Sequence, residues 1–270
     1  MATRNKRILD SVHGYIKMRE ALFRNVVDTP NFQRLRHIEQ TSARSIFPSA
    51  RHDRFIHSLG VFHIGQKMIE AIEKTNECKC FPNNKTLIYN CFRAACLLHD
   101  VGHSPFSHTF EQYYENKACC LMQLLKDEIK NDNFSRDADR YINNSAPHEI
   151  MSAYVVIKAY SKQVKGYRLN LELIVRMIIG CFYGEEAKKH SLENAFIQLI
   201  HGNVIDADGL DYVCRDAWAS GYSAARVDID RLIESVGGHR IVIPLSGGYD
   251  SRLIVNYLFE RGYKNRLWYT

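Results

Sequence analysis

The sequence of 270 residues has no apolar stretch long enough to cross a bilayer, and no continuous apolar segment follows the basic residues near its start. We therefore expect a cytoplasmic protein without a membrane partner, in which the eight cysteines are reduced thiols. The sequence also has no long run of lysine and arginine of the kind that forms a nucleic-acid arm. Its net charge of +6 suits an anionic partner, but nucleic acid is not specifically indicated, and nucleotides fit the pattern as well.

Internal repeats and low-complexity tracts are absent too. Hydrophobic residues make up 46% of the chain and charged residues 24%, which is typical of a globular protein. Apolar residues recur at spacings of three to four positions from about residue 17 to about residue 235, and this period predicts a mainly α-helical domain. The clearest predicted helices cover residues 19–27, 58–74, 87–100, 148–162 and 171–184.

The pattern changes after Val236. Residues 237–270 read as a strand, a glycine-containing turn, a helix and a second strand, which is the order of a small β-α-β segment. We therefore expect a helical domain over residues 1–236 and an incomplete α/β segment over residues 237–270.

Residues 97–111 read LLHDVGHSPFSHTFE and combine three histidines with two acids. Buried imidazoles and carboxylates cost free energy unless each is paired, hydrogen-bonded or bound to a metal. His99 and Asp100 end one predicted helix, and His57 stands near the start of another. Two imidazoles and two carboxylates suit iron, manganese or zinc used as a Lewis acid. The candidate carboxylates further along the chain are Asp206, Asp208, Asp211 and Asp216.

The full order of His57, His99 with Asp100, and Asp208 matches the pattern H…HD…D. With it, the sequence resembles the HD-domain superfamily and, within it, the deoxynucleoside triphosphate triphosphohydrolases, over about residues 8–235. The resemblance implies an HD-domain helical bundle in which these four residues bind one divalent transition metal. It also implies hydrolysis of a deoxynucleoside triphosphate to a deoxynucleoside and triphosphate. The motifs that carry the resemblance are DSVHGYI, DTPNFQRLRHIEQ, RHDRFIHSLGV, LLHDVGHSPFSHTFE, HEIMS and DADGLDYVCRD.

The resemblance further assigns roles in the reaction. His148 corresponds to the histidine that protonates the departing 5′ oxygen, and Glu111 to the acid that orients it and raises its pKa. His103 and His108 correspond to residues near the α-phosphate and the 5′ oxygen. Arg54 corresponds to a residue that grips the polyphosphate, where a guanidinium fork fits better than an ammonium. We assign structural or surface roles to the other histidines, His13, His37, His52, His63, His190, His201 and His239.

The substrate contacts follow from the same resemblance. Gln40, Tyr212 and Asp216 fall where the family recognises deoxyribose, and ribose would be rejected for lack of room at its 2′ position. Gly209 stands where some relatives have a phosphate-binding lysine, and Thr41 stands where leucine is common. These departures leave open a phosphohydrolase acting on another nucleotide or an oligonucleotide, and also a non-catalytic nucleotide sensor. The resemblance leaves room for magnesium bound with the phosphates and for a homo-oligomer.

The stretch IVIPLSGGYDSRLIVNYLFERG, in the last part of the chain, resembles the pyrophosphate-binding loop of ATP pyrophosphatases such as the asparagine synthetases. In such loops glycines let backbone amides approach a phosphate at a helix N-terminus. The sequence continues only to Thr270, so we expect a tight turn here rather than an active ATP site. The residues that carry this likeness are Ser246, Gly247, Gly248, Asp250 and Ser251.

Overall fold

The computed structural model describes residues 4–41, 46–74, 83–111, 117–141, 145–184, 187–202, 205–221, 227–237, 241–243 and 267–269. Within these ranges the chain is mainly helical, which confirms the predicted fold class. Among the helices described, none is both long and apolar enough to cross a membrane. The elements are β1 (Asn5–Asp10), β2 (Gly14–Arg19), α1 (Glu20–Leu22), η1 (Phe23–Val27), α2 (Pro30–Gln33), η2 (Arg34–His37), α3 (Arg54–Lys74), α4 (Lys85–Leu98), η5 (Ser107–Phe110), α6 (Ala118–Ile129), α7 (Asp132–Tyr141), α8 (Pro147–Gly166), α9 (Leu171–Ile178), α10 (Ser191–Gln198), α11 (Ala207–Ser220), α12 (Ile229–Gly237), β3 (Ile241–Ile243) and β4 (Leu267–Tyr269).

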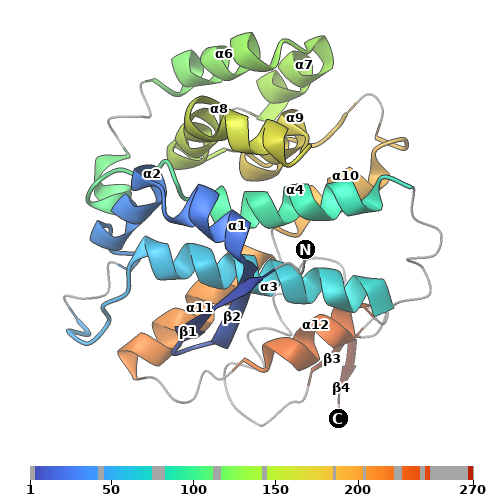
Figure 1. Cartoon of the computed structure of the whole chain (residues 1–270). Helices are drawn as coiled ribbons and strands as arrows, with labels where there is room; N and C mark the ends of the chain where they lie inside the picture. The colour runs from blue at the N-terminus through green and yellow to red at the C-terminus, as the bar shows by residue number, and fades with distance from the viewer. Residues whose placement is uncertain are drawn as a thin grey trace.

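Helices α3 and α4 form the centre of the domain and pack against each other (Figure 1). Helices α11 and α12 contact α3 on one side, and α9 and α10 contact α4 on the other. Leu59, Phe92 and Leu97 have no exposed surface, so these two helices are enclosed by protein over much of their circumference. The N-terminal end of α3 and the C-terminal end of α4 lie inside the molecule, and that is where His57 and His99 stand.

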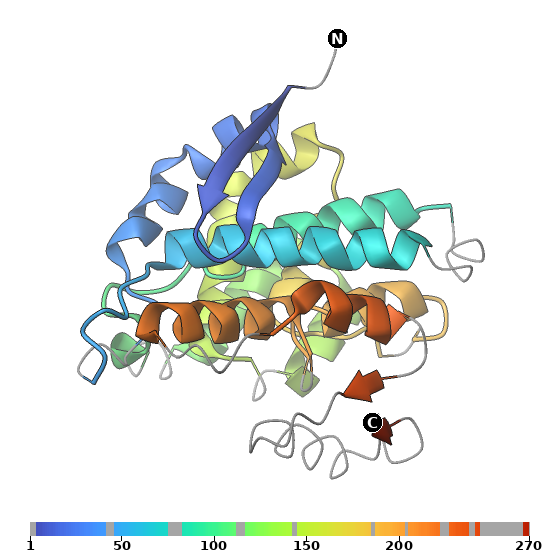
Figure 2. The ribbon, with the colours of Figure 1, turned by 90° about the horizontal axis from the view of Figure 1, so that it is seen from below.

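An antiparallel hairpin of β1 and β2 lies across α3, and the sequence analysis did not predict it (Figure 2). Gly14 closes its turn with a φ of +70°, a conformation that glycine adopts without strain. Ile16 and Met18 face the core, whereas Leu9 is 69% exposed and Tyr15 59% exposed. The alternation of apolar and polar residues is confined to a few positions, so its period was too short to indicate a strand.

The predicted helices match the structure to different extents. Helices α3, α4 and α8 occupy the predicted places to within a few residues at each end. The prediction of one helix over residues 171–184 is wrong beyond Ile178, where α9 ends. Gly180 follows with a φ of +67°, and a β-carbon there would lie 2.2 Å from the ring of His201. The helix predicted over residues 19–27 is divided into α1 and the π-helical turn η1.

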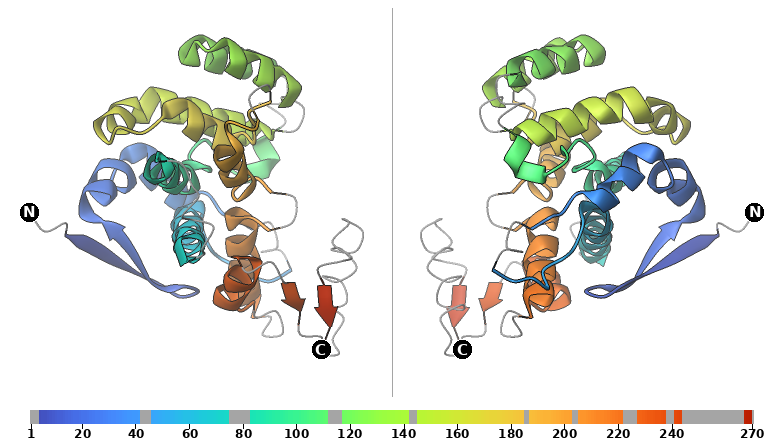
Figure 3. Two further views of the ribbon diagram at one scale, coloured as in Figure 1. Left: turned by 90° about the vertical axis from the view of Figure 1, so that its right-hand side faces the viewer. Right: turned by 90° about the vertical axis from the view of Figure 1, so that its left-hand side faces the viewer.

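The end of the chain contributes two short strands. β3 and β4 pair in parallel, with Ile241 opposite Leu267, and Figure 3 shows them at the edge of the molecule. Parallel pairing requires a crossover connection such as the predicted helix. The residues between the strands, including the SGGYDS motif, lie outside the described residues. The domain boundary near residue 237 therefore stays a prediction.

Candidate active site

Four side chains from the ends of three helices meet at one place, and they are the four predicted metal ligands. His57 lies in the first turn of α3, His99 and Asp100 directly follow α4, and Asp208 lies in the first turn of α11. Nε2 of His57 is 2.8 Å from Oδ1 of Asp208 and 3.7 Å from Oδ2 of Asp100. Nε2 of His99 is 3.6 Å from Oδ2 of Asp100 and 3.7 Å from Oδ1 of Asp208. The ligand atoms of His57, His99 and Asp100 thus lie within 4.8 Å of one another, and Oδ1 of Asp208 lies against both imidazole Nε2 atoms.

Both imidazoles are oriented as metal-binding histidines are. Nδ1 of His57 is 2.7 Å from Oδ2 of Asp211, and Nδ1 of His99 is 2.9 Å from the carbonyl oxygen of Cys96. These oxygens can only accept, so each Nδ1 donates its proton and, in the neutral ring, Nε2 keeps a lone pair. Both Nε2 atoms are buried without a well-formed hydrogen bond to any described residue. A buried polar atom in this state needs a partner, and the donor set fits a divalent transition metal.

The charges around these ligands compensate one another. Burial by itself lowers the pKa of His57, but the carboxylates of Asp208 and Asp211 raise it to about 10. Burial by itself raises the pKa of Asp100, but the guanidinium of Arg54, 2.6 Å away, and the nearby histidines hold it well below its usual range. A metal and a proton therefore compete for Nε2 of His57, because a histidine binds metal in its deprotonated form.

The loop after α4 carries His103 toward α8, and its backbone is specialised for this path. The amide of Gly102 donates to Oγ of Ser152 at 2.8 Å, and a β-carbon at residue 102 would lie 2.2 Å from the backbone nitrogen of Ser152. Only glycine permits so close an approach. Phe106 and Ser107 then adopt left-handed φ angles of 67° and 53°. Such conformations cost free energy for residues other than glycine and are concentrated at functional sites.

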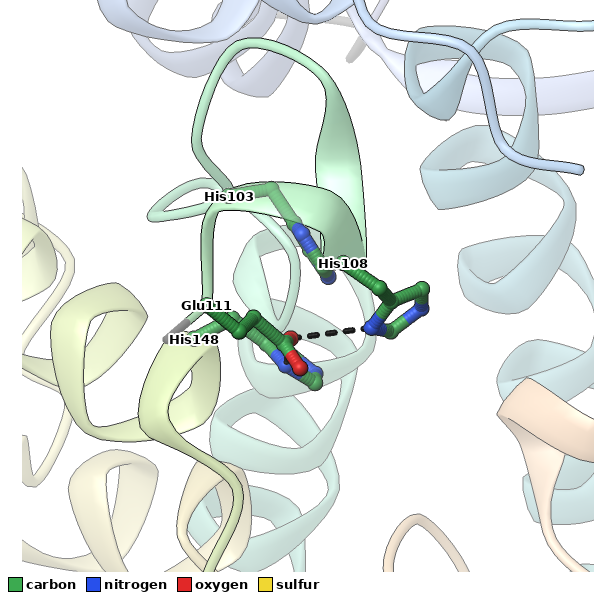
Figure 4. Close-up of side chains that lie close together, drawn as sticks. All are labelled: His103, His108, Glu111 and His148. Atoms are coloured by element: carbon green, nitrogen blue, oxygen red, sulfur yellow. Dashed lines mark hydrogen bonds and ion pairs between the residues drawn. The ribbon is translucent and has the colours of Figure 1, made fainter. Parts of the chain in front are cut away.

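A second group of titratable side chains, His103, His108, Glu111 and His148, lies beside the metal ligands (Figure 4). The rings of His103 and His148 stack, with centroids 4.0 Å apart and 24° between their planes. Oε1 of Glu111 accepts hydrogen bonds from Nδ1 of His108, at 2.9 Å, and from Nδ1 of His148. The structure thus brings together the three predicted catalytic residues and one predicted substrate contact. Oδ1 of Asp100 is 3.3 Å from Nε2 of His103, so the two groups are contiguous.

The surroundings push the pKa values of the two stacked histidines apart. Burial lowers the pKa of His103 to about 3, although Asp100 opposes this change. Burial also acts to lower the pKa of His148, but its hydrogen bond with Glu111 outweighs burial and raises it. Burial acts to raise the pKa of Glu111, but the bond from His148 lowers it to about 2. Near neutral pH His103 is therefore neutral and Glu111 ionised, while His148 is favoured to hold a proton.

Arg54 joins the two groups. Its guanidinium donates to Oδ2 of Asp100 at 2.6 Å and to Oγ of Ser107 at 2.5 and 3.1 Å, and its Nη2 is 3.1 Å from Nε2 of His108. The residue is only 2% exposed. In this arrangement Arg54 holds Asp100 against the loop, and its contact with a polyphosphate stays a prediction.

The three predicted deoxyribose contacts lie beyond the metal ligands. Asp208, Tyr212 and Asp216 follow one another at intervals of four on α11, so they share one face of that helix. Oδ1 of Asp216 is 3.0 Å from Nε2 of His52, and the carbonyl of His52 accepts from the amide of Gln40 at 3.0 Å. Tyr212 is 44% exposed. These residues form a strip that leads away from the metal ligands, and their contact with a sugar stays a prediction.

The sequence analysis did not identify the residues that hold the ligands in place, and it named Asp211 only as one of four candidate carboxylates. Asp211 had a recognisable signal in the sequence, because it lies about one helical turn after Asp208 in an acidic motif. In the structure it accepts a hydrogen bond from His57. His13 was assigned a structural or surface role, yet its side chain is 4% exposed and its Nε2 is 2.6 Å from Oδ1 of Asp211. No local pattern connects these positions. Arg215, which also binds Asp211, was missed although it lies only four positions further along α11.

Several known proteins are similar to this chain in sequence. Residues 54–178 match the family model of the HD domain. The chain is 30% identical over 256 residues to the uncharacterized protein YwfO of Bacillus subtilis, and the match covers 93% of this chain and 48% of that protein. It is 31% identical over 221 residues to the human deoxynucleoside triphosphate triphosphohydrolase SAMHD1, over 78% of this chain and 33% of that protein.

A solved structure is similar to this chain in fold. The crystal structure of a phosphohydrolase from Bacteroides thetaiotaomicron matches with a TM-score of 0.61 at 26% identity, over 95% of this chain and 53% of that one. The chain thus spans about half or less of the length of the proteins it matches. His57, His99 and Asp100 all fall in the part that matches the family model. Residues 54–178 of the chain therefore carry an HD domain.

Proposed function

We propose that this chain is a metal-dependent phosphohydrolase that converts a deoxynucleoside triphosphate into a deoxynucleoside and triphosphate. One observation carries the proposal. The ligand atoms of His57, His99 and Asp100 lie together with Asp208 against the two imidazoles, next to His148, whose pKa a carboxylate raises. A divalent cation held by these four residues supplies Lewis acidity toward a phosphoryl oxygen. Together the two groups offer what the hydrolysis of a phosphate ester needs.

The substrate class is supported by the relatives. The human protein that matches 78% of this chain is named a deoxynucleoside triphosphate triphosphohydrolase. In the proposed reaction the oxygen of water bonds to the α-phosphorus, and the bond from that phosphorus to the 5′ oxygen breaks. The electron pair of that bond goes to the 5′ oxygen, which takes up a proton, while the attacking water gives up one proton, so the net reaction consumes one water. The products are inorganic triphosphate and a deoxynucleoside with a free 5′-hydroxyl.

His148 is the proposed source of that proton. Its Nδ1 donates to Glu111, so Nε2 is the nitrogen left to face the leaving oxygen. Glu111 fixes the ring and raises its pKa, which keeps the proton available near neutral pH. His103 stacks on the ring at 4.0 Å and stays neutral, so it restricts the orientation of His148 without competing as a cation. His108 shares Glu111 and is 60% exposed, which suits contact with the substrate.

The test is a screen of nucleotides with iron, manganese, zinc and magnesium, with the products separated by chromatography. We expect triphosphate and deoxynucleoside in equal amounts. Orthophosphate or a monophosphate as product indicates another phosphohydrolase reaction, which the departures at Thr41 and Gly209 leave open. Binding without turnover indicates a nucleotide sensor. His99→Ala is expected to lose activity and His190→Ala, outside the site, to keep it.

A further inference from the structure

Asp211 stands at the centre of a buried network of charged side chains. Its carboxylate has no exposed surface and lies 2.7 Å from Nδ1 of His57 and 2.6 Å from Nε2 of His13. Nε and Nη2 of Arg215, one turn further along α11, donate to its two oxygens at 2.9 Å each. The carboxylate is therefore held in place by hydrogen bonds to both of its oxygens.

The network continues to the turn of the β1–β2 hairpin. Nη1 of Arg215 donates to Oδ2 of Asp10 at 3.0 Å, across 205 positions of sequence. Oδ1 of Asp10 accepts from the backbone amides of Val12 and His13 at 2.9 and 2.7 Å. Asp10 thus shapes the turn with one oxygen and anchors Arg215 with the other. The turn in its fixed shape presents the ring of His13 to Asp211.

The packing of α3 against α11 leaves room for these groups. A β-carbon at residue 60 would lie 1.8 Å from Oδ1 of Asp211 and 2.6 Å from Nη2 of Arg215. Gly60 follows His57 by one turn of α3, so its missing side chain admits the carboxylate directly beside the ligand. Apolar side chains would fill this space at lower cost, because desolvating several charged groups is expensive. The arrangement is therefore better explained by orientation of His57 than by packing.

We propose that Asp10 and His13 are positioning residues of the metal centre, which act on His57 through Asp211 and Arg215. This inference rests on the proposed function, because it requires that His57 binds a metal. Asp211 keeps the proton of His57 on Nδ1, which leaves the Nε2 lone pair for the metal. His13 and Arg215 prevent the carboxylate from turning away. The hydrogen-bond partners of metal-binding histidines typically change metal affinity by about 10- to 100-fold when they are replaced.

The experiment measures zinc and cobalt affinity of the 270-residue chain by competition with a chromophoric chelator. Asp211→Asn is expected to bind metal about 10- to 100-fold more weakly and to change the visible spectrum of the cobalt-loaded protein. Asp10→Asn and His13→Ala are expected to weaken metal binding and to change the cobalt spectrum in the same direction as Asp211→Asn, but by smaller amounts. Tyr15→Ala is the matched control, because it alters an exposed side chain of the same hairpin. The double variant Asp10→Asn with Asp211→Asn is expected to lose no more affinity than Asp211→Asn alone, since Asp10 acts through Asp211.

The outcomes separate this proposal from the one on which it rests. If the unaltered chain binds no metal, or if His99→Ala binds it equally well, the metal centre itself is wrong. If His99→Ala loses the metal while Asp10→Asn and His13→Ala keep unaltered affinity and cobalt spectra, only the positioning role is wrong. Circular dichroism and denaturation midpoints report folding in each variant. A loss of affinity that merely follows the unfolded fraction makes the network structural and overturns the proposal. Should Asp211→Asn not fold, the two hairpin variants decide.

Discussion

Replacing Glu111 by glutamine removes the carboxylate that the structure pairs with His148. Burial acts to raise the pKa of Glu111, but His148 and His108 lower it from 4.5 to about 2. At about 1.4 kcal/mol per pKa unit, this shift corresponds to at most about 3.5 kcal/mol of folding stability. The side chain is 18% exposed, so solvent screening reduces the expected loss to about 1–2 kcal/mol. We expect Glu111→Gln to lower the free energy of unfolding by that amount.

The free energy of unfolding that Glu111→Gln loses depends on pH. The lowered pKa of Glu111 contributes stability above pH 4.5, and this contribution disappears as the pH falls from 4.5 through about 2. The raised pKa of His148 contributes stability below pH 6.5, and this contribution disappears as the pH rises through the folded-state pKa. Both contributions are present between these limits. Denaturant titrations should therefore show the largest difference in unfolding free energy between the unaltered protein and Glu111→Gln at about pH 5.5. The difference should be smaller at about pH 3 and at about pH 9.

The same substitution is expected to move the pH dependence of turnover. A rate that requires protonated His148 falls as the pH rises through its pKa, and without the carboxylate that fall should begin at lower pH. Glu193→Gln is the matched control, because Glu193 lies 3.2 Å from His190, three positions along the chain as Glu111 lies from His108, but outside the site. An alkaline limb that stays in place in Glu111→Gln, as in the control, would refute the role given to the pair.

Further predictions concern the ligands, the proton donor, the helix contact and the end of the chain. His99→Ala is expected to lower the bound metal, measured by elemental analysis, and to abolish turnover. His148→Ala is expected to lower turnover by roughly 10²- to 10⁴-fold at near-normal metal content, measured by steady-state kinetics. Gly60→Ala places a β-carbon 1.8 Å from Asp211 and is expected to cost roughly 1–3 kcal/mol in denaturant unfolding. A chain ending at Gly237 is expected to keep its helical circular dichroism and its metal, because all four proposed ligands precede that point; an unfolded, metal-free truncation would contradict the boundary.

The success of sequence analysis on the fold depended on the length of each periodic segment. Helices α3 and α8 carry apolar residues at helical spacing over many turns, so their existence and approximate bounds followed from the sequence. In residues 171–184 the apolar residues continue beyond the last turn of α9, so their spacing did not mark its end. The stop depends on the left-handed backbone of Gly180. The β1–β2 hairpin has too few alternating positions to compete with the helical pattern that follows it.

The candidate site was predictable where its residues lie at helix ends in recognisable motifs. The resemblance to the HD-domain superfamily predicted His57, His99 with Asp100, and Asp208 as ligands, and the structure brings them together at three helix ends. His13 could not be found in this way, because 198 positions separate it from Asp211 and only tertiary packing joins them. The low pKa of His103 was equally inaccessible, since it follows from burial that no local pattern reports.

Asp100 explains why the proposed metal ligands and the proposed proton donor form one site. Its Oδ2 faces Nε2 of His57 and of His99 at 3.7 and 3.6 Å, while its Oδ1 lies 3.3 Å from Nε2 of His103, which stacks on His148. The phosphorus that needs a Lewis acid and the oxygen that needs a proton are bonded to each other, so the two groups must lie within reach of a single bond. One shared carboxylate fixes that separation. It follows that a change at Asp100 disturbs both functions together, whereas His99→Ala alters the ligand set alone and gives the cleaner test of the metal.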